Sequence, residues 1–152
     1  MLSWIFLHDY RLVMKKLIYS VRIIALLTGC STVPISSEGA KNVPKERIYK
    51  QKIFNKTINE QARVTFMRDS GFFGGGCSHD IYINDEKAFS LRPGEQATVY
   101  LTPQYYIFRL ETGGGLCPNI ATSQESELKE NSDAKYRILL PSDGNLRLTR
   151  IK

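Results

Sequence analysis

The segment 96–102 reads Gln-Ala-Thr-Val-Tyr-Leu-Thr, and apolar and polar positions alternate along its length. A period of two places Ala97, Val99 and Leu101 on one face of a β-strand and the residues between them on the other. The segment before it, 92–95, reads Arg-Pro-Gly-Glu, which is typical of a tight turn. A short strand that is buried on one face and begins at a turn predicts an antiparallel β-structure.

The same pattern continues on both sides of this strand, and it predicts short strands separated by turns. We expect strands at 63–69, 80–84, 88–91, 96–102, 105–111, 120–128, 136–140 and 146–151. The last two are expected to form a hairpin across Pro-Ser-Asp-Gly at 141–144. Helical periodicity is weak throughout this region, although 44–50, with Pro44 first, favours a short helix. The expected fold is therefore all-β, a small antiparallel β-sandwich of about seven or eight strands.

Three consecutive segments carry a resemblance to known β-sandwiches. They read Ile-Tyr-Ile-Asn-Asp-Glu-Lys at 81–87, Leu-Arg-Pro-Gly-Glu at 91–95 and Val-Tyr-Leu-Thr-Pro-Gln-Tyr-Tyr at 99–106. Together they resemble PEGA-like β-sandwich repeats, in which a hairpin turn and then a Pro-Gly turn separate the strands. The sequence departs from that pattern because Asp85-Glu86 and Gln104 stand where glycine is usual, so we expect both turns to be wider.

A second resemblance concerns the segment 68–77, Arg-Asp-Ser-Gly-Phe-Phe-Gly-Gly-Gly-Cys. It is similar to a segment of bacterial outer-membrane lipoproteins of uncharacterised function. The two resemblances together cover about residues 62–150. They imply a fold and a location, and they bring no activity with them.

The N-terminal residues have the pattern of an export signal. Met14-Lys15-Lys16 gives a basic start, 17–27 is mostly apolar, and Leu-Thr-Gly-Cys at 27–30 resembles the lipobox of bacterial lipoproteins. The resemblance implies that 1–29 is a signal peptide and that the Cys30 thiol receives a diacylglyceryl group. Because a second basic start follows the unrelated residues 1–13, we expect translation to begin at Met14. The alternative is an apolar N-terminal helix that contains a cysteine by chance, which Arg22 within the apolar stretch favours.

The residue after the lipidated cysteine indicates a location. Ser31 resembles the residue found there in lipoproteins sorted to the outer membrane, so we expect attachment to its inner leaflet, facing the periplasm. Two or more acyl chains anchor a protein stably. Residues 31–43 are rich in Ser, Pro and Gly, which is typical of a flexible tether. The expected organisation is a signal at 1–29, the lipidated cysteine, tether and short helix at 30–61, and the sandwich at 62–152.

The charge of the chain does not point to nucleic acid. The formal net charge is +6, but residues 1–29 contain four basic side chains and one acidic one, so half of the excess belongs to the leader. Much of the remaining basic excess lies in and just after the tether. The tyrosines that alternate with basic residues are best explained by cross-strand packing. The expected partners are the membrane, through the anchor, and an envelope protein.

With Cys30 assigned to lipid, Cys77 and Cys117 remain, and an oxidising compartment favours one disulfide between them. Each follows a glycine triplet, for which we expect positive φ angles or close loop crossings. No Gly-Lys-Ser/Thr follows either triplet, so phosphate binding is not indicated. We expect an interaction loop formed by Phe72, Phe73, Gly74, Gly75, Gly76, Gly113, Gly114 and Gly115, with at least one of the phenylalanines buried.

No catalytic constellation is evident. His79 is the only histidine after the leader, and a metal site usually needs three or four ligands, so no metal or cofactor is expected. We expect His79 at the surface or rim, with Asp69 and Glu111 as the acids closest to the glycine-rich loops. The favoured function is a non-enzymatic structural or protein-interaction module. The alternatives are an accessory or inhibitor protein that binds a periplasmic partner through the glycine-rich loops, and a small envelope hydrolase that uses His79.

Overall fold

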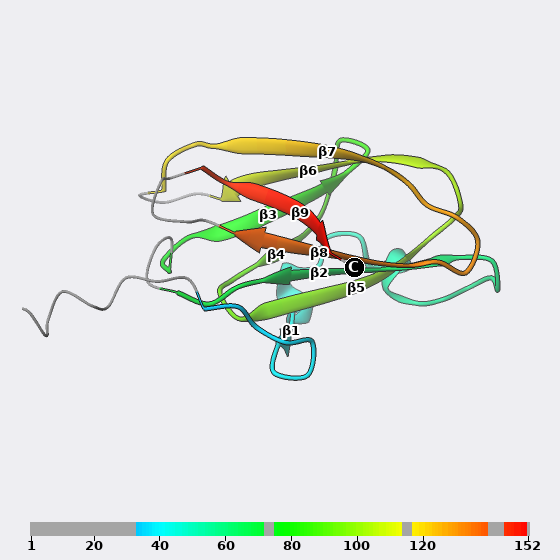
Figure 1. The fold of residues 1–152 in the computed structure, drawn as a ribbon, viewed down its shortest axis with the longest axis horizontal. Helices are drawn as coiled ribbons and strands as arrows, with labels where there is room; N and C mark the ends of the chain where they lie inside the picture. The colour runs from blue at the N-terminus through cyan, green and yellow to red at the C-terminus, as the bar shows by residue number, and fades with distance from the viewer. Residues whose placement is uncertain (1–32, 72–74, 114–116, 140–144, 152) are drawn as a thin grey trace, which may run out of the picture. The chain divides into compact units, whose positions relative to one another are not determined.

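The computed structural model describes residues 33–71, 75–113, 117–139 and 145–151. The chain divides into two units after Cys30, and all of the described residues belong to the second, residues 31–152. Within this unit two β-sheets face each other (Figure 1). The predicted all-β sandwich is therefore confirmed.

The first sheet has five strands in the order β1-β5-β2-β8-β9, and the second has four in the order β4-β3-β6-β7. Two short 3-10 helices, η1 and η2, precede β2. The elements are β1 (Lys41–Asn42), η1 (Lys45–Arg47), η2 (Gln51–Phe54), β2 (Ala62–Arg68), β3 (Ser78–Ile83), β4 (Glu86–Leu91), β5 (Glu95–Leu101), β6 (Tyr105–Gly113), β7 (Ala121–Glu127), β8 (Asp133–Leu139) and β9 (Arg147–Ile151).

Each of the eight predicted strands has a counterpart, and β8 and β9 pair antiparallel, as predicted. The turn predicted between them, at 141–144, lies outside the described residues. The pairing is not antiparallel throughout, because β2 pairs with β8 in parallel and the additional strand β1 pairs with β5 in parallel. Alternation along one strand indicates which face is buried but not which strand lies beside it. The mixed pairing therefore could not follow from the alternation alone.

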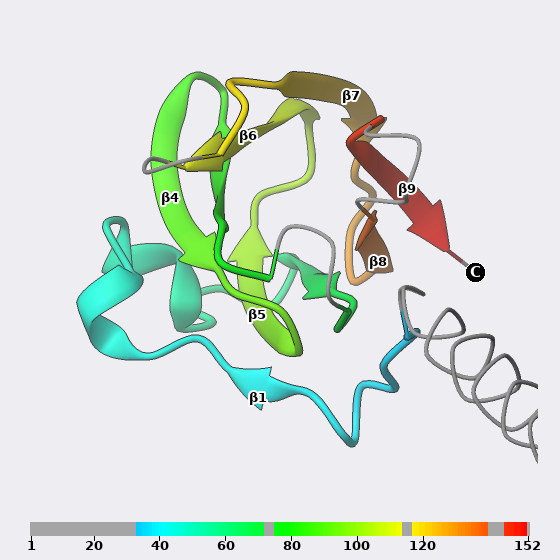
Figure 2. The ribbon, with the colours of Figure 1, turned by 90° about the vertical axis from the view of Figure 1, so that its left-hand side faces the viewer.

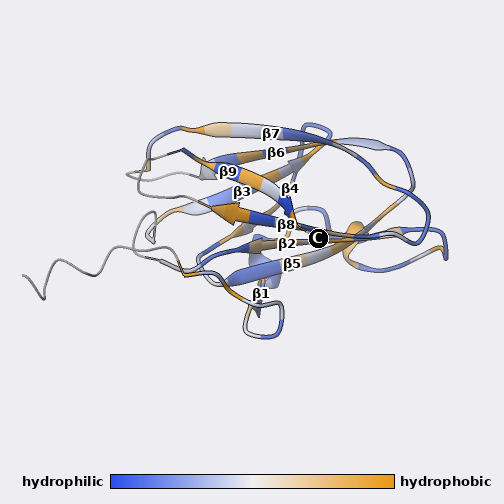
Figure 3. Cartoon of the chain, in the orientation of Figure 1, coloured by the Kyte–Doolittle hydropathy of each residue, from blue (hydrophilic) through white to orange (hydrophobic). Residues whose placement is uncertain are grey.

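Four fully buried aromatic side chains, one each from β2, β4, β6 and β8, hold the two sheets together. Phe66 lies at their centre, with its ring centroid 5.2 Å from Phe108, 5.2 Å from Tyr136 and 5.6 Å from Phe89. Aromatic pairs at such separations contribute about 0.5–1.5 kcal/mol each beyond their buried area. Figure 3 shows the accompanying alternation as orange and blue bands along the strands.

The turn between β3 and β4 is tighter than expected. Ile83 pairs with Glu86, and the two residues between them, Asn84 and Asp85, have φ angles of 50° and 65°. This is the backbone of a two-residue type I′ turn, which Asn and Asp tolerate better than most residues. The expectation of a wider hairpin turn was wrong, because Asn84 and Asp85 supply the positive φ angles without a glycine.

The two other predicted turns connect the sheets. In 92–95 the Glu95 N–H donates to the Arg92 carbonyl at 3.1 Å and Gly94 has a φ of 78°, as in a type II turn. This turn joins β4 of one sheet to β5 of the other. The segment 102–104 likewise leads from β5 to β6 of the opposite sheet, so it is a crossover and not a hairpin.

Residues 33–61 lie against the sandwich, where a tether had been expected. Val33 forms an antiparallel bridge with Ser70, β1 extends the sheet beside β5, and the Val43 side chain is buried. We call residues 33–43 the covering segment. Figure 2 shows its path past β1 toward the short helices. The folded domain therefore begins well before the expected boundary at residue 62.

The short helix expected at 44–50 is a 3-10 helix, η1, for which Pro44 is the N-cap residue. It places Arg47 against Glu95, with Nη1 and Oε2 2.7 Å apart, and this hydrogen-bonded carboxylate raises the pKa of Arg47. After η2, the Phe54 ring meets Phe89 edge-on at 5.7 Å. The region between the covering segment and β2 thus closes one side of the core.

Candidate functional site

Cys77 and Cys117 form a disulfide, as predicted, with sulfur atoms 2.06 Å apart and Cα atoms 5.9 Å apart. Cys77 immediately precedes β3 and Cys117 follows β6, and these strands are paired through Ser78 and Gly113. The bond closes a loop of 40 residues. The chain-entropy model assigns about 4 kcal/mol of stability to such a closure, less any strain in the native state. We call this the disulfide end of the sandwich.

The predicted interaction loop is described only in part. Phe72, Phe73, Gly74, Gly114 and Gly115 lie outside the described residues, and so does Cys30. Gly75 and Gly76 form an exposed turn, and Gly113 ends β6. A Cβ added at Gly76 would meet no atom within 4 Å. Neither a positive φ nor a close contact requires glycine at this position, contrary to the expectation.

His79 is fully buried, so the prediction of a surface or rim position was wrong. It is in phase with Ile81 and Ile83 on the inner face of β3, and its paired neighbours are Leu91 and Thr112. Burial, assisted by the nearby Arg68 cation, lowers the pKa of His79 to about 3. Neither ring nitrogen has a hydrogen-bond partner. His79 is therefore a neutral core residue at ordinary pH.

Arg68 is a buried cation that the sequence reasoning missed. It is in phase with Val64 and Phe66 on β2, and its Nη1 donates to the Cys77 carbonyl at 2.6 Å and to the Leu91 carbonyl at 2.8 Å. Burial lowers the pKa of Arg68 to about 10. Its hydrogen bonds connect β2 to the chain at the beginning of β3 and the end of β4. The sequence did contain a signal for this burial, because Arg68 follows the apolar Val64 and Phe66 at the spacing of two that places residues on one face of a strand.

The two acids nearest the glycine-rich loops do not meet His79. Asp69 follows Arg68 directly, and its Oδ1 accepts a hydrogen bond from the Ile35 N–H at 3.1 Å and lies 3.4 Å from Arg137 Nε. Burial raises the pKa of Asp69. Glu111 forms an ion pair with Arg109. Neither carboxylate is a partner of the His79 ring, so the structure does not assemble an acid–histidine pair from these residues.

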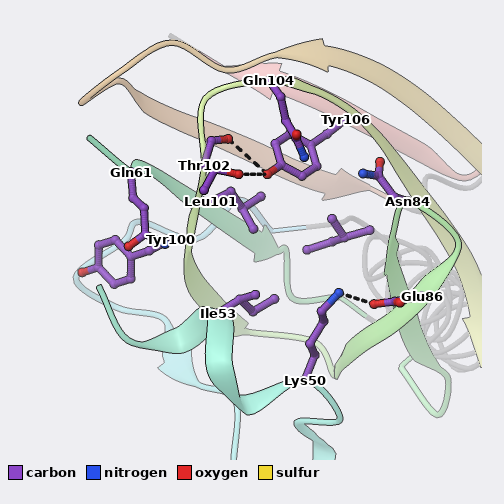
Figure 4. Close-up of a pocket in the computed structure, with 11 residues that line it drawn as sticks. Lys50, Ile53, Gln61, Asn84, Glu86, Tyr100, Leu101, Thr102, Gln104 and Tyr106 are labelled. Atoms are coloured by element: carbon purple, nitrogen blue, oxygen red, sulfur yellow. Dashed lines mark hydrogen bonds and ion pairs between the residues drawn. The ribbon is translucent and has the colours of Figure 1, made fainter. Parts of the chain in front are cut away.

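A hollow lies at the opposite end of the sandwich from the disulfide. Its volume is about 340 Å³, within the range of small-molecule sites. Figure 4 shows its lining, which comes from four elements, namely η2, the β3–β4 turn, the end of β5 and the beginning of β6, and from Gln61 just before β2. We call it the distal pocket. Its apolar lining consists of Ile53 and the buried side chains of Ile83, Leu101 and Tyr106.

Two amide side chains in the distal pocket have a fixed orientation. The Gln61 Oε1 accepts from the Thr57 N–H at 2.8 Å and from the Ile58 N–H at 3.2 Å. The Asn84 Oδ1 accepts from the Ile107 N–H at 3.0 Å. Because a backbone N–H holds each carbonyl oxygen, the orientation of each amide is fixed and its nitrogen is available as a hydrogen-bond donor. No sequence motif had indicated this pocket, since its residues are spread over 50–106.

The outer face of the four-stranded sheet carries exposed apolar side chains beside charged ones. Tyr105 is 73% exposed and Ile107 is 45% exposed, and across the sheet they pair with Glu127 and Glu125. Next to them the Arg109 guanidinium lies 4.1 Å from the centroid of the Tyr82 ring, a cation–π contact. We call Tyr105, Ile107, Glu125 and Glu127 the outer patch.

Comparison with known proteins adds no identification, because no protein-family model and no curated protein sequence matches the chain. Among the described residues, no group of three or more His, Cys, Asp or Glu side chains is arranged to hold a metal ion. Nor does that part of the chain contain a helix long and apolar enough to cross a membrane.

The burial of His79 predicts a specific pH dependence. Its pKa in the folded protein is lowered from 6.5 to about 3, so below pH 6.5 protons bind the unfolded chain preferentially, and stability falls as the pH falls. From pH 7 to pH 5 the loss is expected to be about 2 kcal/mol. The variant His79→Leu should not show this loss of unfolding free energy when urea unfolding is measured at pH 7 and pH 5. Equal losses in the two proteins would contradict the burial of a neutral imidazole.

Proposed function

We propose that the protein is a lipid-anchored lipoprotein of the bacterial envelope whose β-sandwich acts as a non-enzymatic protein-interaction module. The leader and the Leu-Thr-Gly-Cys motif at 27–30 support the anchor, and the Cys77–Cys117 disulfide supports an oxidising compartment. Attachment to the inner leaflet of the outer membrane, facing the periplasm, follows from Ser31. No bond or ion pair described for His79 supports the hydrolase alternative.

The observation that carries this proposal is how soon the folded domain begins after Cys30. Only two residues separate Cys30 from Val33, which is already bridged to Ser70 through hydrogen bonds of 2.6 and 3.1 Å. Three extended residues span at most about 11 Å. A lipid on Cys30 would therefore hold the disulfide end close to the membrane surface. This arrangement would present one orientation of the sandwich to the periplasm.

The outer patch is the surface best suited to a protein partner. Its exposed Tyr105 and Ile107 offer apolar contact, while Glu125 and Glu127 bring negative charge to the same face. Charge complementarity favours a partner that combines apolar and basic side chains. The described part of the alternative contact surface, Gly75, Gly76 and Gly113, lies at the disulfide end, where a partner would have to lie at the membrane surface.

The anchor can be tested by fractionation of cells that produce the full chain. The wild-type protein is expected in the outer-membrane fraction with a mass increase at Cys30 that matches lipid modification. Cys30→Ser should leave the outer-membrane fraction, and Ser31→Asp should move the protein to the inner membrane. Retention of Cys30→Ser in the outer membrane would contradict the anchor. An unchanged location of Ser31→Asp would contradict the sorting assignment only.

The interaction surface can be tested by crosslinking in intact envelopes followed by capture of the full-length protein. The double variant Tyr105→Ser/Ile107→Ser should lose crosslinked partners that the wild-type protein retains, and elevated salt should weaken the wild-type crosslinks. Ile58→Ser is the matched control, because Ile58 is 48% exposed and lies outside the outer patch. Identical partners for the double variant and the wild-type protein would contradict the assignment of the outer patch.

A further inference from the structure

We infer that the distal pocket binds an uncharged saccharide. The pocket lies where β3 turns into β4 and β5 leads into β6, at the end of the strands away from Cys77 and Val33. In the proposed orientation of the domain it faces away from the membrane. The residues that line the pocket do not include any part of the proposed anchor.

Hydrogen-bond donors of fixed orientation lie on opposite sides of the pocket. In Figure 4, Gln61 lies on one side of the opening and Asn84 on the other. With their carbonyl oxygens held by backbone N–H groups, both side chains can offer N–H donors to a ligand. They match a ligand that presents several acceptor oxygens around a compact ring, which is the chemistry of sugar hydroxyl groups.

The pocket also offers hydroxyl groups and an exposed amide. Tyr106 donates its hydroxyl hydrogen to the Thr102 carbonyl at 3.1 Å, and its oxygen lies 3.0 Å from Thr102 Oγ1. This holds the Thr102 side chain at the rim. Gln104, from the same connection, is exposed beside it. Polar groups that both donate and accept are those that discriminate among hydroxylated ligands.

The charges of the pocket cancel. Its only formally charged lining residues among those described are Lys50 and Glu86, which form an ion pair with each other (Figure 4). The adjacent ammonium group lowers the pKa of Glu86, so the carboxylate stays ionised and the pair stays neutral overall. Such a rim gives no excess charge for an anionic or cationic ligand. The favoured ligand is therefore polar but uncharged.

Apolar side chains form the remainder of the site. Ile53 from η2, which packs against the core, lines the pocket together with the buried Ile83 and Leu101. A sugar ring carries C–H groups on its faces and hydroxyl groups around its edge, so it can cover such a surface while its edge reaches the amides. The combination of an apolar floor and a few oriented polar groups is characteristic of small-molecule sites.

The test is titration calorimetry on the full-length protein in a detergent without a sugar headgroup. The probes are chitotriose, cellotriose and the anionic trigalacturonate, each at up to about 10 mM, above the Kd of about 1 mM that marks weak binding. Saturable binding of chitotriose or cellotriose, and not of trigalacturonate, is expected. Preference for chitotriose would identify an N-acetylated ligand, and equal binding would show that hydroxyl groups suffice.

Two nearly isosteric variants test whether the saccharide binds at the amide groups of the pocket. Asn84→Asp and Gln61→Glu keep the acceptor oxygens that bind Ile107 and Thr57 but remove the N–H donors. Each variant is expected to raise the Kd for the saccharide about threefold to tenfold, which is the effect of one lost hydrogen bond. Neither variant should lower the melting temperature. Asn131→Asp is the matched control, because Asn131 also has a positive φ, of 53°, and lies outside the pocket lining.

Three results would overturn the inference. The first is the absence of binding to both neutral trisaccharides at the highest concentration. The second is binding of trigalacturonate that equals or exceeds theirs. The third is binding that Asn84→Asp and Gln61→Glu leave unchanged, or that Asn131→Asp weakens equally. Since none of these results depends on Cys30, they are distinguishable from a failure of the lipid anchor in fractionation.

Discussion

Strand β2 is buried on both of its faces, and the other parts of the domain are arranged around this constraint. Every residue of β2 except Arg63 is buried. Its inner face carries Phe66, the centre of the aromatic cluster that joins the two sheets. Its outer face carries Met67, and the covering segment meets this face through a contact between Ser37 Oγ and Met67 Sδ at 3.4 Å. A β-sandwich usually exposes its outer faces, so β2 needs the covering segment.

The end of β2 couples this burial to the rest of the domain. Arg68 and Asp69 are consecutive and both buried. Arg68 donates to the carbonyl groups of Cys77 and Leu91, next to β3 and β4. Asp69 accepts from the Ile35 N–H and forms an ion pair with Arg137. Removing the partner of a buried charged group generally costs several kcal/mol. The disulfide closes the same end of the sandwich. The end next to the proposed anchor is thus held by the disulfide and by the bonds of two buried charged side chains, whereas the distal pocket lies where the strands are joined by turns.

The sequence predicts the strands well because each is short and bounded by turn residues, as 96–102 illustrates. It predicts the candidate site poorly. The predicted strand at 80–84 in fact begins at Ser78, and those two added residues are what put His79 in phase with Ile81 inside the core. Asn84 and Asp85 form the tight turn that glycine was expected to require. The distal pocket combines residues from four separate elements, so nothing in local spacing could reveal it.

The covering segment shows that amino-acid composition alone does not predict whether a segment is held in the fold. Residues 31–43 have the Ser, Pro and Gly content of a tether. The composition of a segment does not show its long-range hydrogen-bond partners. Here Val33 bonds to Ser70, Ile35 to Asp69 and Ser37 to Gln96. Because the residues just after β2 and Gln96 of the neighbouring β5 supply these partners, the segment is held although its own sequence has little tendency to fold. This attachment links the proposed anchor to a defined orientation of the sandwich.

Hydrogen exchange at the Val33 and Ile35 amides tests whether the covering segment folds together with β2. Both amides are hydrogen-bonded to the end of β2, to the Ser70 carbonyl at 2.6 Å and to Asp69 Oδ1 at 3.1 Å. They are predicted to be protected in the full-length protein and to lose protection at the same denaturant concentration as the amides of β2. Exchange of Val33 and Ile35 at the rate of an unstructured chain, while β2 remains protected, would show that the sandwich does not hold the covering segment.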